Sequence, residues 1–364
     1  MSRTLEPGLR VGGVTPPPSK SHAHRVLIAE ALSGRFASLA PQPDDCADIV
    51  ATKRCLTGIY RGETVLDCGE SGTTRRLLGP LVPALGRKAA WTMRGRLASR
   101  PQIEYDGLTS GRHELRGDVS SQFASGLLFA LPLLVGDSEI RFTTPLQSRG
   151  YVEMTRDVLS AYGIRTEETP DGYFVPGGQR YVAPASPLRI EADWSGAAFW
   201  LAANALGNRV AVSGLDWSSR QPDRRIADVF AAFPPCVDVD PFPDSFPVLS
   251  VAAACRAGMT EFVGIRRLRL KESDRVAAMS DVLSRFGVRV EVGAERFVVH
   301  GKDAPLRGGE FAVFGDHRVA MSVAVAATRA EGPVTLDDET CVGKSYLGFW
   351  RDFDALSSLR FQKS

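Results

Sequence analysis

Acidic residues embedded among bases are the first candidates for chemistry in this sequence. Glu272 follows Lys271 and stands three residues before Arg275, a spacing that would place acid and base on one face of a helix. Asp244 stands just before an apolar run at 248–255. A positioned carboxylate can take up or deliver a proton during a reaction. Each acid also has a plain structural interpretation, a surface ion pair for Glu272 and a helix cap for Asp244, and both interpretations stay open here.

A second pattern joins small or hydroxyl residues to a base at the expected start of a helix. The first turn of a helix presents free backbone N–H groups, and its dipole favours an anion. A lysine or arginine there has the wrong sign for the helix itself, so these bases indicate that anionic groups bind nearby. Ser, Thr and Asp are also ordinary N-caps, so one instance alone would carry little weight. Small or hydroxyl residues stand at five expected helix starts, of which four also carry a base, namely Pro18–Ser21, Glu70–Arg76, Arg269–Arg275 and Phe314–Arg318, and one, Gly117–Gln122, does not.

Several well-known catalytic signatures are absent from the sequence. Gly343-Lys344-Ser345 has the end of a phosphate-binding P-loop, but Asp338 stands where the first glycine is required. No Gly-x-Gly-x-x-Gly segment follows an expected strand, so a dinucleotide-binding fold has no support. The five histidines form no HExxH motif, and Gly-x-Ser-x-Gly does not occur. Metal-dependent and serine-dependent hydrolysis therefore lack a sequence signature.

Length and charge limit the classes of protein that fit. The 364 residues are about right for two domains, since most domains have roughly 100 to 200 residues. The 44 basic and 42 acidic residues nearly balance, whereas a protein that binds nucleic acid usually has a strong basic excess. The longest apolar stretch, 123–135, is too short to span a membrane. Six scattered cysteines and an N-terminus without a signal-peptide pattern predict a cytoplasmic protein with buried free thiols.

The elements that must position the candidate residues alternate between short strands and amphipathic helices. This interleaving along the whole chain is typical of an α/β fold. Two segments, 15–18 and 185–193, are the best candidates for linkers. We expect strands at 89–93, 139–142, 173–175, 210–213, 288–292 and 297–300, and helices at 22–32, 73–81, 121–134, 152–162, 197–205, 226–233, 273–286 and 317–329.

Ten motifs, in order along nearly the whole chain, resemble those of the enolpyruvyl transferases. Within this family they are most similar to the members that act on shikimate 3-phosphate. A single motif of this kind would be weak, but ten in one order with suitable spacing are highly specific. The motifs are Pro18-Ser-Lys-Ser-x-x-x-Arg25, Ser71-Gly-Thr-Thr-x-Arg76, Ser99-Arg-Pro101, Ser120-Ser-Gln-Phe123, Ser148-x-x-Tyr151, Glu191-x-Asp-x-Ser195, Asp244, Leu270-Lys-Glu-Ser-Asp-Arg275, Asp316-His-Arg-x-Ala-Met321 and Cys341-Val-Gly-Lys344.

The resemblance implies a two-domain α/β fold of the inside-out barrel type, with each half built from three βαβαββ-like units. One half would be the inserted segment 20–191, and the other would join 1–19 to 192–364. The active site would lie in the cleft between the halves, with helix N-termini of both halves pointing into it. In this family, substrates draw the halves together, and the closure excludes water.

The resemblance also implies an activity. This is the transfer of the enolpyruvyl (1-carboxyvinyl) group of phosphoenolpyruvate to the 5-hydroxyl of shikimate 3-phosphate, with release of phosphate. The step belongs to the shikimate pathway to chorismate and the aromatic amino acids, and it is the target of the inhibitor glyphosate. No metal or organic cofactor is implied, because lysines, arginines and helix termini meet the charges of both substrates. We expect a monomer that binds these small molecules and has no nucleic-acid or membrane partner.

Roles follow residue by residue at the positions that match the family's motifs. Asp244 would remove the proton of the attacking hydroxyl, and either Lys20 or Glu272 would protonate the methylene carbon. A carboxylate between cations tends to stay ionised, which leaves the choice between Lys20 and Glu272 open. Shikimate 3-phosphate would be held by Ser21, Arg25, Ser120, Ser121, Gln122, Ser148, Tyr151 and Lys271. Phosphoenolpyruvate would be held by Lys20, Gly72, Arg100, Gln122, Arg275, His317, Arg318 and Lys344.

Some positions depart from the pattern of the family. The chain is shorter than most members, through trimmed connections. Glu70, His24 and Arg267 each stand where an asparagine is common, and Gly315 replaces the usual residue before Asp316. Such changes leave open a paralogous carboxyvinyltransferase that acts on a different acceptor alcohol.

Two further types of protein fit the motifs less well. The sister enzyme that uses UDP-N-acetylglucosamine begins with Lys-Asn instead of Ser-Lys-Ser, and its loop cysteine has no match here. A non-catalytic sugar-phosphate-binding protein on the same scaffold would have no need of the retained Lys20, Asp244 and Glu272. Phosphate release on mixing the substrates separates the enzymes from the binding protein.

Overall fold

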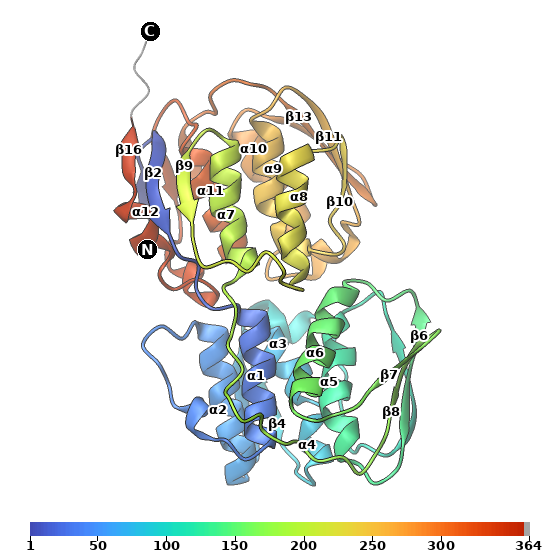
Figure 1. Ribbon diagram of the computed structural model, residues 1–364. Helices are drawn as coiled ribbons and strands as arrows, with labels where there is room; N and C mark the ends of the chain where they lie inside the picture. Colours follow the sequence, from blue (N-terminus) through green and yellow to red (C-terminus); the bar gives the residue numbers. More distant parts are fainter. Residues whose placement is uncertain (360–364) are drawn as a thin grey trace. The chain divides into compact units, whose positions relative to one another are not determined.

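The computed structural model describes residues 1–359 and divides the chain into two compact units. Unit 1 combines Met1–Ser19 with the segment from Ala192 onwards, and unit 2 is the inserted segment Lys20–Glu191. Within each unit the helices pack together and the sheets flank them (Figure 1). Among the described residues, no helix has both the length and the apolar character needed to cross a bilayer.

Unit 2 carries two sheets beside its helices. Strands β3 and β4 pair in parallel, and the other sheet has the order β5-β6-β8-β7, in which only β5 and β6 are parallel. The helices are α1 (Lys20–Leu32), α2 (Ala47–Arg61), α3 (Gly72–Leu78), α4 (Leu81–Ala84), α5 (Ser121–Ala130) and α6 (Arg149–Ala161), and the strands are β3 (Val65–Gly69), β4 (Ala90–Met93), β5 (Gly111–Arg116), β6 (Ser138–Thr144), β7 (Glu167–Thr169) and β8 (Gly172–Val175).

Helix α5 forms the apolar centre of unit 2. Every one of its residues except Gln122 is buried, as expected of a helix that is apolar all round. It ends at Ala130 and passes into a 3-10 turn, Leu131–Leu133, so the predicted helix 121–134 is too long. The reason is Pro132, which has no N–H to donate and cannot continue an α-helix.

The first part of unit 2 is built from helices alone. From Lys20 to Arg61 the chain forms α1, a short 3-10 turn at Ala37–Leu39 and α2, without a strand. The connection between the helices contains Gly34, two prolines and two aspartates, all of which are depleted in strands.

Unit 1 carries three sheets, two of which depend on the N-terminal strands. Strand β1 pairs with β15 in the sheet β1-β15-β14, and β2 lies between β16 and β9. The remaining sheet has the order β10-β11-β13-β12. The strands are β1 (Arg3–Leu5), β2 (Leu9–Val14), β9 (Arg209–Val212), β10 (Cys236–Asp238), β11 (Gly258–Val263), β12 (Arg289–Val292), β13 (Arg296–Gly301), β14 (Gly309–Phe311), β15 (Val334–Leu336) and β16 (Ser357–Leu359), and the helices are α7 (Trp194–Ala205), α8 (Arg225–Ala232), α9 (Phe246–Ala254), α10 (Arg275–Arg285), α11 (His317–Ala327) and α12 (Phe349–Ala355).

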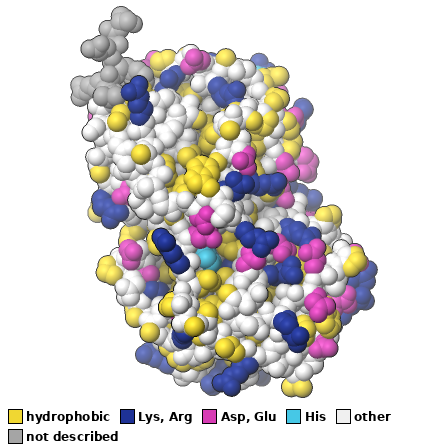
Figure 2. Space-filling model, in the orientation of Figure 1, with side chains coloured by type: hydrophobic (Ala, Val, Ile, Leu, Met, Phe, Trp, Pro, Cys, Tyr) yellow, Lys and Arg dark blue, Asp and Glu magenta, His cyan; other side chains and the backbone are white. Residues whose placement is uncertain are grey.

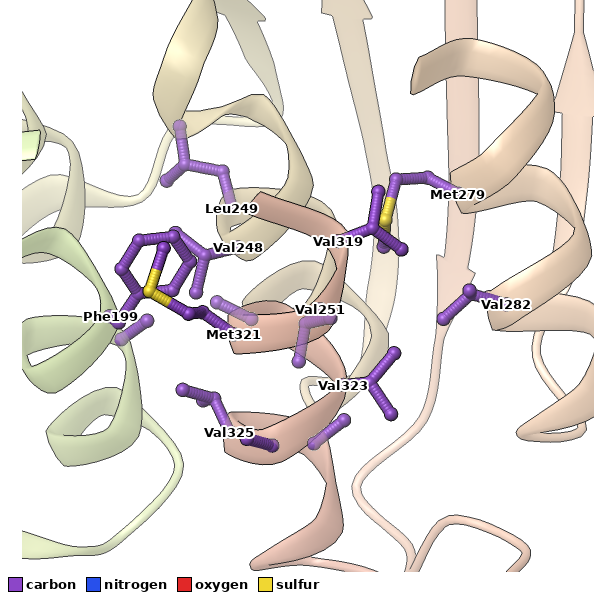
Figure 3. Packing of buried hydrophobic residues seen from close by; sticks show 14 of the residues in the cluster. Phe199, Val248, Leu249, Val251, Met279, Val282, Val319, Met321, Val323 and Val325 are labelled. Carbon is purple, nitrogen blue, oxygen red and sulfur yellow. The ribbon is translucent and has the colours of Figure 1, made fainter. Parts of the chain in front are cut away.

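Helix α11 is the centre of unit 1, and all of its residues are buried. Its apolar side chains meet Phe199 of α7, Val248 of α9 and Met279 of α10, so three helices surround it (Figure 3). Truncation of such a side chain to alanine typically costs about 2–5 kcal/mol because it leaves a cavity. The same helix begins with His317 and Arg318, so the packing of the core fixes where these two polar residues lie.

Most of the expected elements exist, but some were missed. Helix α2 was not predicted, and α9 was recognised only as an apolar run. The predicted helix 73–81 is divided into α3 and α4 at Gly79 and Pro80. On the face shown in Figure 2, basic and acidic side chains are interspersed, in keeping with the net charge of +2.

All six cysteines are free. Cys46, Cys55 and Cys68 are buried, and burial raises the pKa of the Cys46 and Cys68 thiols to about 11. Cys236 is exposed, contrary to the expectation of buried thiols, because it lies at the start of the short edge strand β10.

Candidate active site

The five segments rich in small or hydroxyl residues, four of which carry a base, all lie at helix N-termini. Lys20 is the first residue of α1, and Arg275 is the first residue of α10. Side chains of Ser71, Ser120 and Asp316 cap α3, α5 and α11 by accepting a backbone N–H of the first turn. The predicted placement of bases at the positive ends of helices is therefore confirmed for Lys20 and Arg318, whereas Arg76 lies in the last turn of α3 and Lys271 precedes α10.

In unit 2, Lys20 is paired with an acid from the next helix. Its Nζ lies 2.8 Å from Oδ2 of Asp48, in the first turn of α2. The Lys20 side chain is only 13% exposed and that of Asp48 only 7%, so the pair is largely shielded from water. A neighbouring carboxylate favours the charged form of an amine, so Lys20 is held as an ammonium. The sequence around Asp48 gives no sign of this pairing, because the two residues are 28 positions apart.

Arg25 is buried between three helices and is held by neutral oxygens. Its Nε donates to Oγ1 of Thr155 at 2.8 Å, and its Nη1 donates to the Ser21 carbonyl at 2.6 Å. Its Nη2 donates to the Tyr151 carbonyl at 2.9 Å. Burial lowers the pKa of Arg25 to about 10. No carboxylate appears among these partners, so the positive charge is solvated by the protein without being cancelled.

The start of α5 joins two of the predicted binding residues to α3. Ser120 accepts the Gln122 N–H at 3.3 Å, and the Gln122 side chain bridges two residues of α3. Its Oε1 accepts from Arg76 at 2.9 Å and its Nε2 donates to Thr73 at 2.8 Å. The side chain of Gln122 is thus fixed in one orientation, with Ser121 buried beside it.

Ser148, at the start of α6, has a strained backbone. Its φ is 50° and its ψ is 43°, in the left-handed region that residues other than glycine rarely adopt. Its carbonyl accepts the Tyr151 N–H at 3.1 Å, so the turn closes directly onto the helix. Such strain costs on the order of 1 kcal/mol or more and is concentrated at functional sites. The two predicted binding residues of this motif are therefore placed by one tight turn.

The Gly72 segment brings two guanidinium groups together. A Cβ added at Gly72 would lie 3.0 Å from Arg76 Nη1 and 3.3 Å from Arg100 Nη1. Arg100 follows the 3-10 turn Gly95–Ser99, far from Gly72 in sequence, and the fold places it at the start of α3. Glu70 occupies the space beside Gly95 that a side chain would need there, so it packs against the turn that precedes Arg100.

In unit 1, Arg275 is surrounded by carboxylates. It lies 2.9 Å from Asp316, 2.8 Å from Asp244 and 3.0 Å from Glu272. Burial alone would lower the pKa of Arg275, but the three acids raise it above its ordinary value. Burial also lowers the pKa of Lys271, against the attraction of Asp244. The cluster thus balances cations and anions inside the protein.

Asp244 is the residue on which three cations of unit 1 converge. Besides Arg275, its oxygens lie 3.3 Å from Lys271 Nζ and 3.4 Å from Arg318 Nη2. It belongs to a 3-10 turn, Pro243–Ser245, and not to the cap of α9, whose N-cap is Ser245. The helix-cap interpretation of Asp244 is therefore wrong, and the carboxylate is a quarter exposed beside these cations.

Asp316 is fully buried at the start of α11. The sequence predicted no separate role for it beyond its place in the motif that ends at Met321. It accepts the Arg318 N–H at 2.9 Å and the Ser273 hydroxyl at 2.9 Å. Burial would raise the pKa of Asp316, but the Arg275 guanidinium holds it below its usual value. Arg318 in turn donates to the carbonyl and the hydroxyl of Ser195 at the start of α7. His317 is buried in the same turn.

One prediction about unit 1 needs correction. Helix α10 begins at Arg275 and not at Ser273, because Asp274 is its N-cap and accepts the Ala277 N–H at 3.0 Å. Lys271 and Glu272 therefore precede the helix, and the shared-face argument from helical spacing does not apply to them. The ion pair between Glu272 and Arg275 forms nonetheless, since the chain turns sharply at the cap.

Two departures from the family's pattern have structural explanations within unit 1. Arg267 donates to the Asp240 carboxylate at 2.7 Å and to its backbone carbonyl at 3.0 Å, so it ties a 3-10 turn to the end of β10. Gly315 has φ of 61° and follows Phe314 with φ of 57° in a tight turn, where glycine is the residue that tolerates such values.

The predicted binding residue Lys344 ends a 3-10 turn, Thr340–Lys344, that packs against α11.

The predicted site residues thus form two groups. Unit 2 brings together Lys20, Ser21 and Arg25 with the starts of α3, α5 and α6, and unit 1 brings together Asp244, Lys271, Glu272, Arg275, His317 and Arg318. Within residues 1–359, no group of three or more His, Cys, Asp or Glu side chains is arranged to hold a metal ion.

Comparison with known proteins identifies the family. The family model for EPSP synthase (3-phosphoshikimate 1-carboxyvinyltransferase) matches residues 96–233 and 231–353. A protein named 3-phosphoshikimate 1-carboxyvinyltransferase from Clostridium kluyveri is 34% identical over 415 aligned positions, covering 97% of this chain and 96% of the relative. A protein of the same name from Clostridium perfringens (strain SM101) is 33% identical, with 98% of both chains covered.

Comparison with solved structures identifies the fold. EPSP synthase from Acinetobacter baumannii has a TM-score of 0.75 at 21% identity, covering 99% of this chain and all of that one. The enolpyruvyl transferase NikO from Streptomyces tendae has a TM-score of 0.64 at 15% identity, with 98% and 97% covered. The two-domain α/β fold predicted from the motifs is therefore confirmed, and the chain belongs to the EPSP synthase family.

Proposed function

We propose that this protein transfers the enolpyruvyl group of phosphoenolpyruvate to the 5-hydroxyl of shikimate 3-phosphate and releases phosphate, as the names of its relatives state for them. The observation that carries this proposal is Asp244, a partly exposed carboxylate among three cations. Such a carboxylate is ionised and available as a base, and the cations beside it suit anionic substrates. The relatives' names give no support to a different acceptor alcohol.

Unit 2 would bind shikimate 3-phosphate. Its group is rich in hydroxyl and amide groups, from Ser21, Ser120, Ser121 and Ser148, and it carries the buried cation Arg25. Hydroxyls and backbone N–H groups at helix starts are ordinary donors to phosphate and carboxylate. Gln122 and Tyr151 complete this group, and Lys271 of unit 1 would join them.

Phosphoenolpyruvate would be held mainly by guanidinium and ammonium groups. At Gly72 the guanidinium groups of Arg76 and Arg100 come close to the start of α3, and Lys20 is the first residue of α1. From unit 1 we assign Arg275, His317, Arg318 and Lys344 to the same substrate, with Gln122 from unit 2. Guanidinium groups form paired hydrogen bonds with carboxylate and phosphate, so they also stabilise the phosphate as it leaves.

The chemistry consists of an addition followed by an elimination. The 5-hydroxyl oxygen bonds to C2 of phosphoenolpyruvate as Asp244 takes its proton, and the methylene carbon gains a proton. In the second step the bond from C2 to the phosphate oxygen breaks, the phosphate leaves with the electron pair, and a methyl proton is removed to restore the double bond. We assign the first carbon protonation to the Lys20 ammonium and the final deprotonation to Glu272, because Arg275 holds Glu272 as a carboxylate.

We also propose that the protein works as a monomer in the cytoplasm. Six free cysteines fit a reducing compartment, in which thiols stay reduced. Light scattering during gel filtration measures the mass in solution, and a mass twice that of the chain would contradict the monomer.

The test of the activity is phosphate release from phosphoenolpyruvate and shikimate 3-phosphate, run beside plain shikimate and a Lys20→Met variant. We expect release that needs both shikimate 3-phosphate and Lys20. Release with another alcohol in place of shikimate 3-phosphate would move the acceptor to that compound. No release from a folded protein that binds both substrates would reject the proposed reaction.

A further inference from the structure

Helices α1 and α2 are joined by two polar contacts one helical turn apart. Lys20 and His24 are four residues apart on α1, and Asp48 and Thr52 are four apart on α2, so each pair shares a helix face. In the contact nearer the start of both helices, Lys20 Nζ lies 2.8 Å from Asp48 Oδ2. One turn further into the protein, His24 Nδ1 lies 2.7 Å from Thr52 Oγ1.

The deeper contact belongs to a buried line of hydrogen bonds that reaches a third helix. His24 and Thr52 have no exposed surface, and Thr52 Oγ1 lies 2.7 Å from Oγ1 of Thr74 in α3. Thr74 Oγ1 lies 2.8 Å from Oγ of Ser71, the N-cap of α3. A buried polar line of this kind holds three helices in one register, because any slip would leave a polar group without a partner.

The hydrogen bonds of this line fit together in either direction. Thr74 has one hydroxyl hydrogen, and Oγ of Ser71 at 2.8 Å and Oγ1 of Thr52 at 2.7 Å both lie within reach of it. Nδ1 of His24 can donate to Thr52 or accept from it, depending on the tautomer of the ring. The ring of His24 is neutral, since burial lowers the pKa of His24 to about 3. In both arrangements the contact between α1 and α2 is made by Nδ1 of His24.

We propose that His24 is a positioning residue for Lys20, acting through the hydrogen bond to Thr52 that fixes the distance between α1 and α2. The Lys20 stem is flexible, but its ammonium is placed by Asp48, and Asp48 moves with α2. Loss of the deeper contact would let α1 shift against α2 and change where the ammonium lies. A displacement of about 1 Å at a reacting group can cost on the order of a hundredfold in rate. This role for His24 in catalysis rests on the proposed function.

The test compares substitutions that break the contact with substitutions that keep it. His24→Leu removes the ring nitrogen that contacts Thr52, whereas His24→Asn keeps an amide group, which can donate or accept, close to the place of Nδ1. Thr52→Val removes the hydroxyl at nearly constant volume, and Thr52→Ser retains it. We expect kcat/KM for phosphoenolpyruvate to fall about tenfold to a hundredfold in His24→Leu and Thr52→Val, and to stay within about threefold in the other two. The Kd of shikimate 3-phosphate, measured by calorimetry, should change little.

A matched control separates positioning from general loss of stability. Tyr181 is buried in unit 2, and its hydroxyl donates to the Phe129 carbonyl at 2.8 Å, away from every predicted site residue. Tyr181→Phe removes one buried hydrogen bond and should lower the melting temperature without changing kcat/KM. If Tyr181→Phe reduced kcat/KM as much as Thr52→Val does, the effect would be structural and the proposal would be wrong.

A readout independent of turnover keeps this inference distinct from the proposed function. The chain has seven lysines, so after reductive methylation with a carbon-13 label the Lys20 resonance can be assigned by its absence in Lys20→Arg. We expect this resonance to move in His24→Leu and Thr52→Val and to stay in place in His24→Asn and Tyr181→Phe. An unmoved Lys20 resonance in His24→Leu would overturn the positioning role even in an active enzyme. A moved resonance in a protein that releases no phosphate would support the positioning and reject only the reaction.

Discussion

The two units hold their cations in different ways. In unit 2, Arg25 donates to the Thr155 hydroxyl and to two backbone carbonyls. In unit 1, Arg275 faces the carboxylates of Asp244, Glu272 and Asp316. The first arrangement satisfies hydrogen bonds but leaves the charge in place, and the second cancels the charge.

This difference points to different tasks. A buried cation whose partners are neutral keeps a positive potential, so it favours a ligand that is always anionic. A cation matched by carboxylates offers less net attraction to an anion, but it keeps those carboxylates ionised as proton acceptors. Unit 2 is therefore suited to anchoring shikimate 3-phosphate, and unit 1 combines proton transfer with cations that we assign to phosphoenolpyruvate. Lys20 differs from Arg25 in being paired with a carboxylate, that of Asp48, and it is also the residue of unit 2 to which we assign chemistry.

The largest effect is expected when the proton acceptor of unit 1, Asp244, is removed. Asp244→Asn should lower kcat by about 10²–10⁴-fold, because the attacking hydroxyl loses its proton acceptor. Since the amide cannot neutralise Lys271, Arg275 and Arg318, anion binding should be retained or tightened. Steady-state phosphate release and calorimetric titration of shikimate 3-phosphate measure the two effects. Weakened binding with nearly normal kcat would place anchoring, and not proton transfer, in unit 1.

The charge balance of unit 1 also predicts how stability depends on pH. The pKa of Asp316 is depressed in the folded protein, so its contribution is present above the unfolded pKa of about 3.9 and is lost as the pH falls through the lower folded value. Asp316→Asn should cost about 3–5 kcal/mol at pH 7, because Arg275 loses a buried partner. Urea unfolding at pH 7 and near pH 3 should show that this difference shrinks in acid. A difference independent of pH would mean that the carboxylate charge is not the cause.

The anchoring role of unit 2 is tested by changing the shape of its buried cation. Arg25→Lys keeps the charge but loses the fork that contacts Ser21, Thr155 and Tyr151. We expect the Kd of shikimate 3-phosphate to rise by roughly 30-fold, equivalent to about 2 kcal/mol, with a smaller change in KM for phosphoenolpyruvate. Equal weakening of both substrates would indicate a general distortion of unit 2.

The smallest effect is expected from a single methyl group. Gly72→Ala would place a methyl 3.0 Å from Arg76 Nη1 and 3.3 Å from Arg100 Nη1, so both guanidinium groups must move slightly. We expect KM for phosphoenolpyruvate to rise about tenfold, or about 1.4 kcal/mol, with little change in kcat. Gly107→Ala, where nothing lies within 4 Å of the new methyl, is the matched control. Similar kinetics for both variants would show that the space at Gly72 is not part of the site.

The sequence predicted the fold class and the helix starts because these depend on local signals. Ser71, Ser120 and Asp316 are recognisable N-caps, and each does cap a helix. Helix α9 was missed as a helix because all nine of its residues are buried, so it shows no periodic polar face. Strands of three residues, such as β1 and β7, are too short to produce a pattern.

The charge balance of the site could not be predicted from the sequence. Asp244 and Asp316 lie 31 and 41 residues from Arg275, so only the fold shows that they share one guanidinium. The same holds for Asp48, 28 residues from Lys20. Spacing predicted the pairing of Glu272 with Arg275, but for the wrong reason, since Glu272 lies outside the helix.

The pairing of the first strands with the last has a consequence for synthesis on the ribosome. Thr4 of β1 contacts Thr335 of β15, 331 residues later, and β2 pairs with β16 at the end of the described chain. The whole of unit 2 emerges from the ribosome while β1 and β2 still wait for their partners. Domains generally fold as units during synthesis, so unit 2 should reach its structure first. Strand β2 can pair with β9 soon after unit 2 has been made, whereas β1 stays without its partner until β15 has been synthesised near the end of the chain.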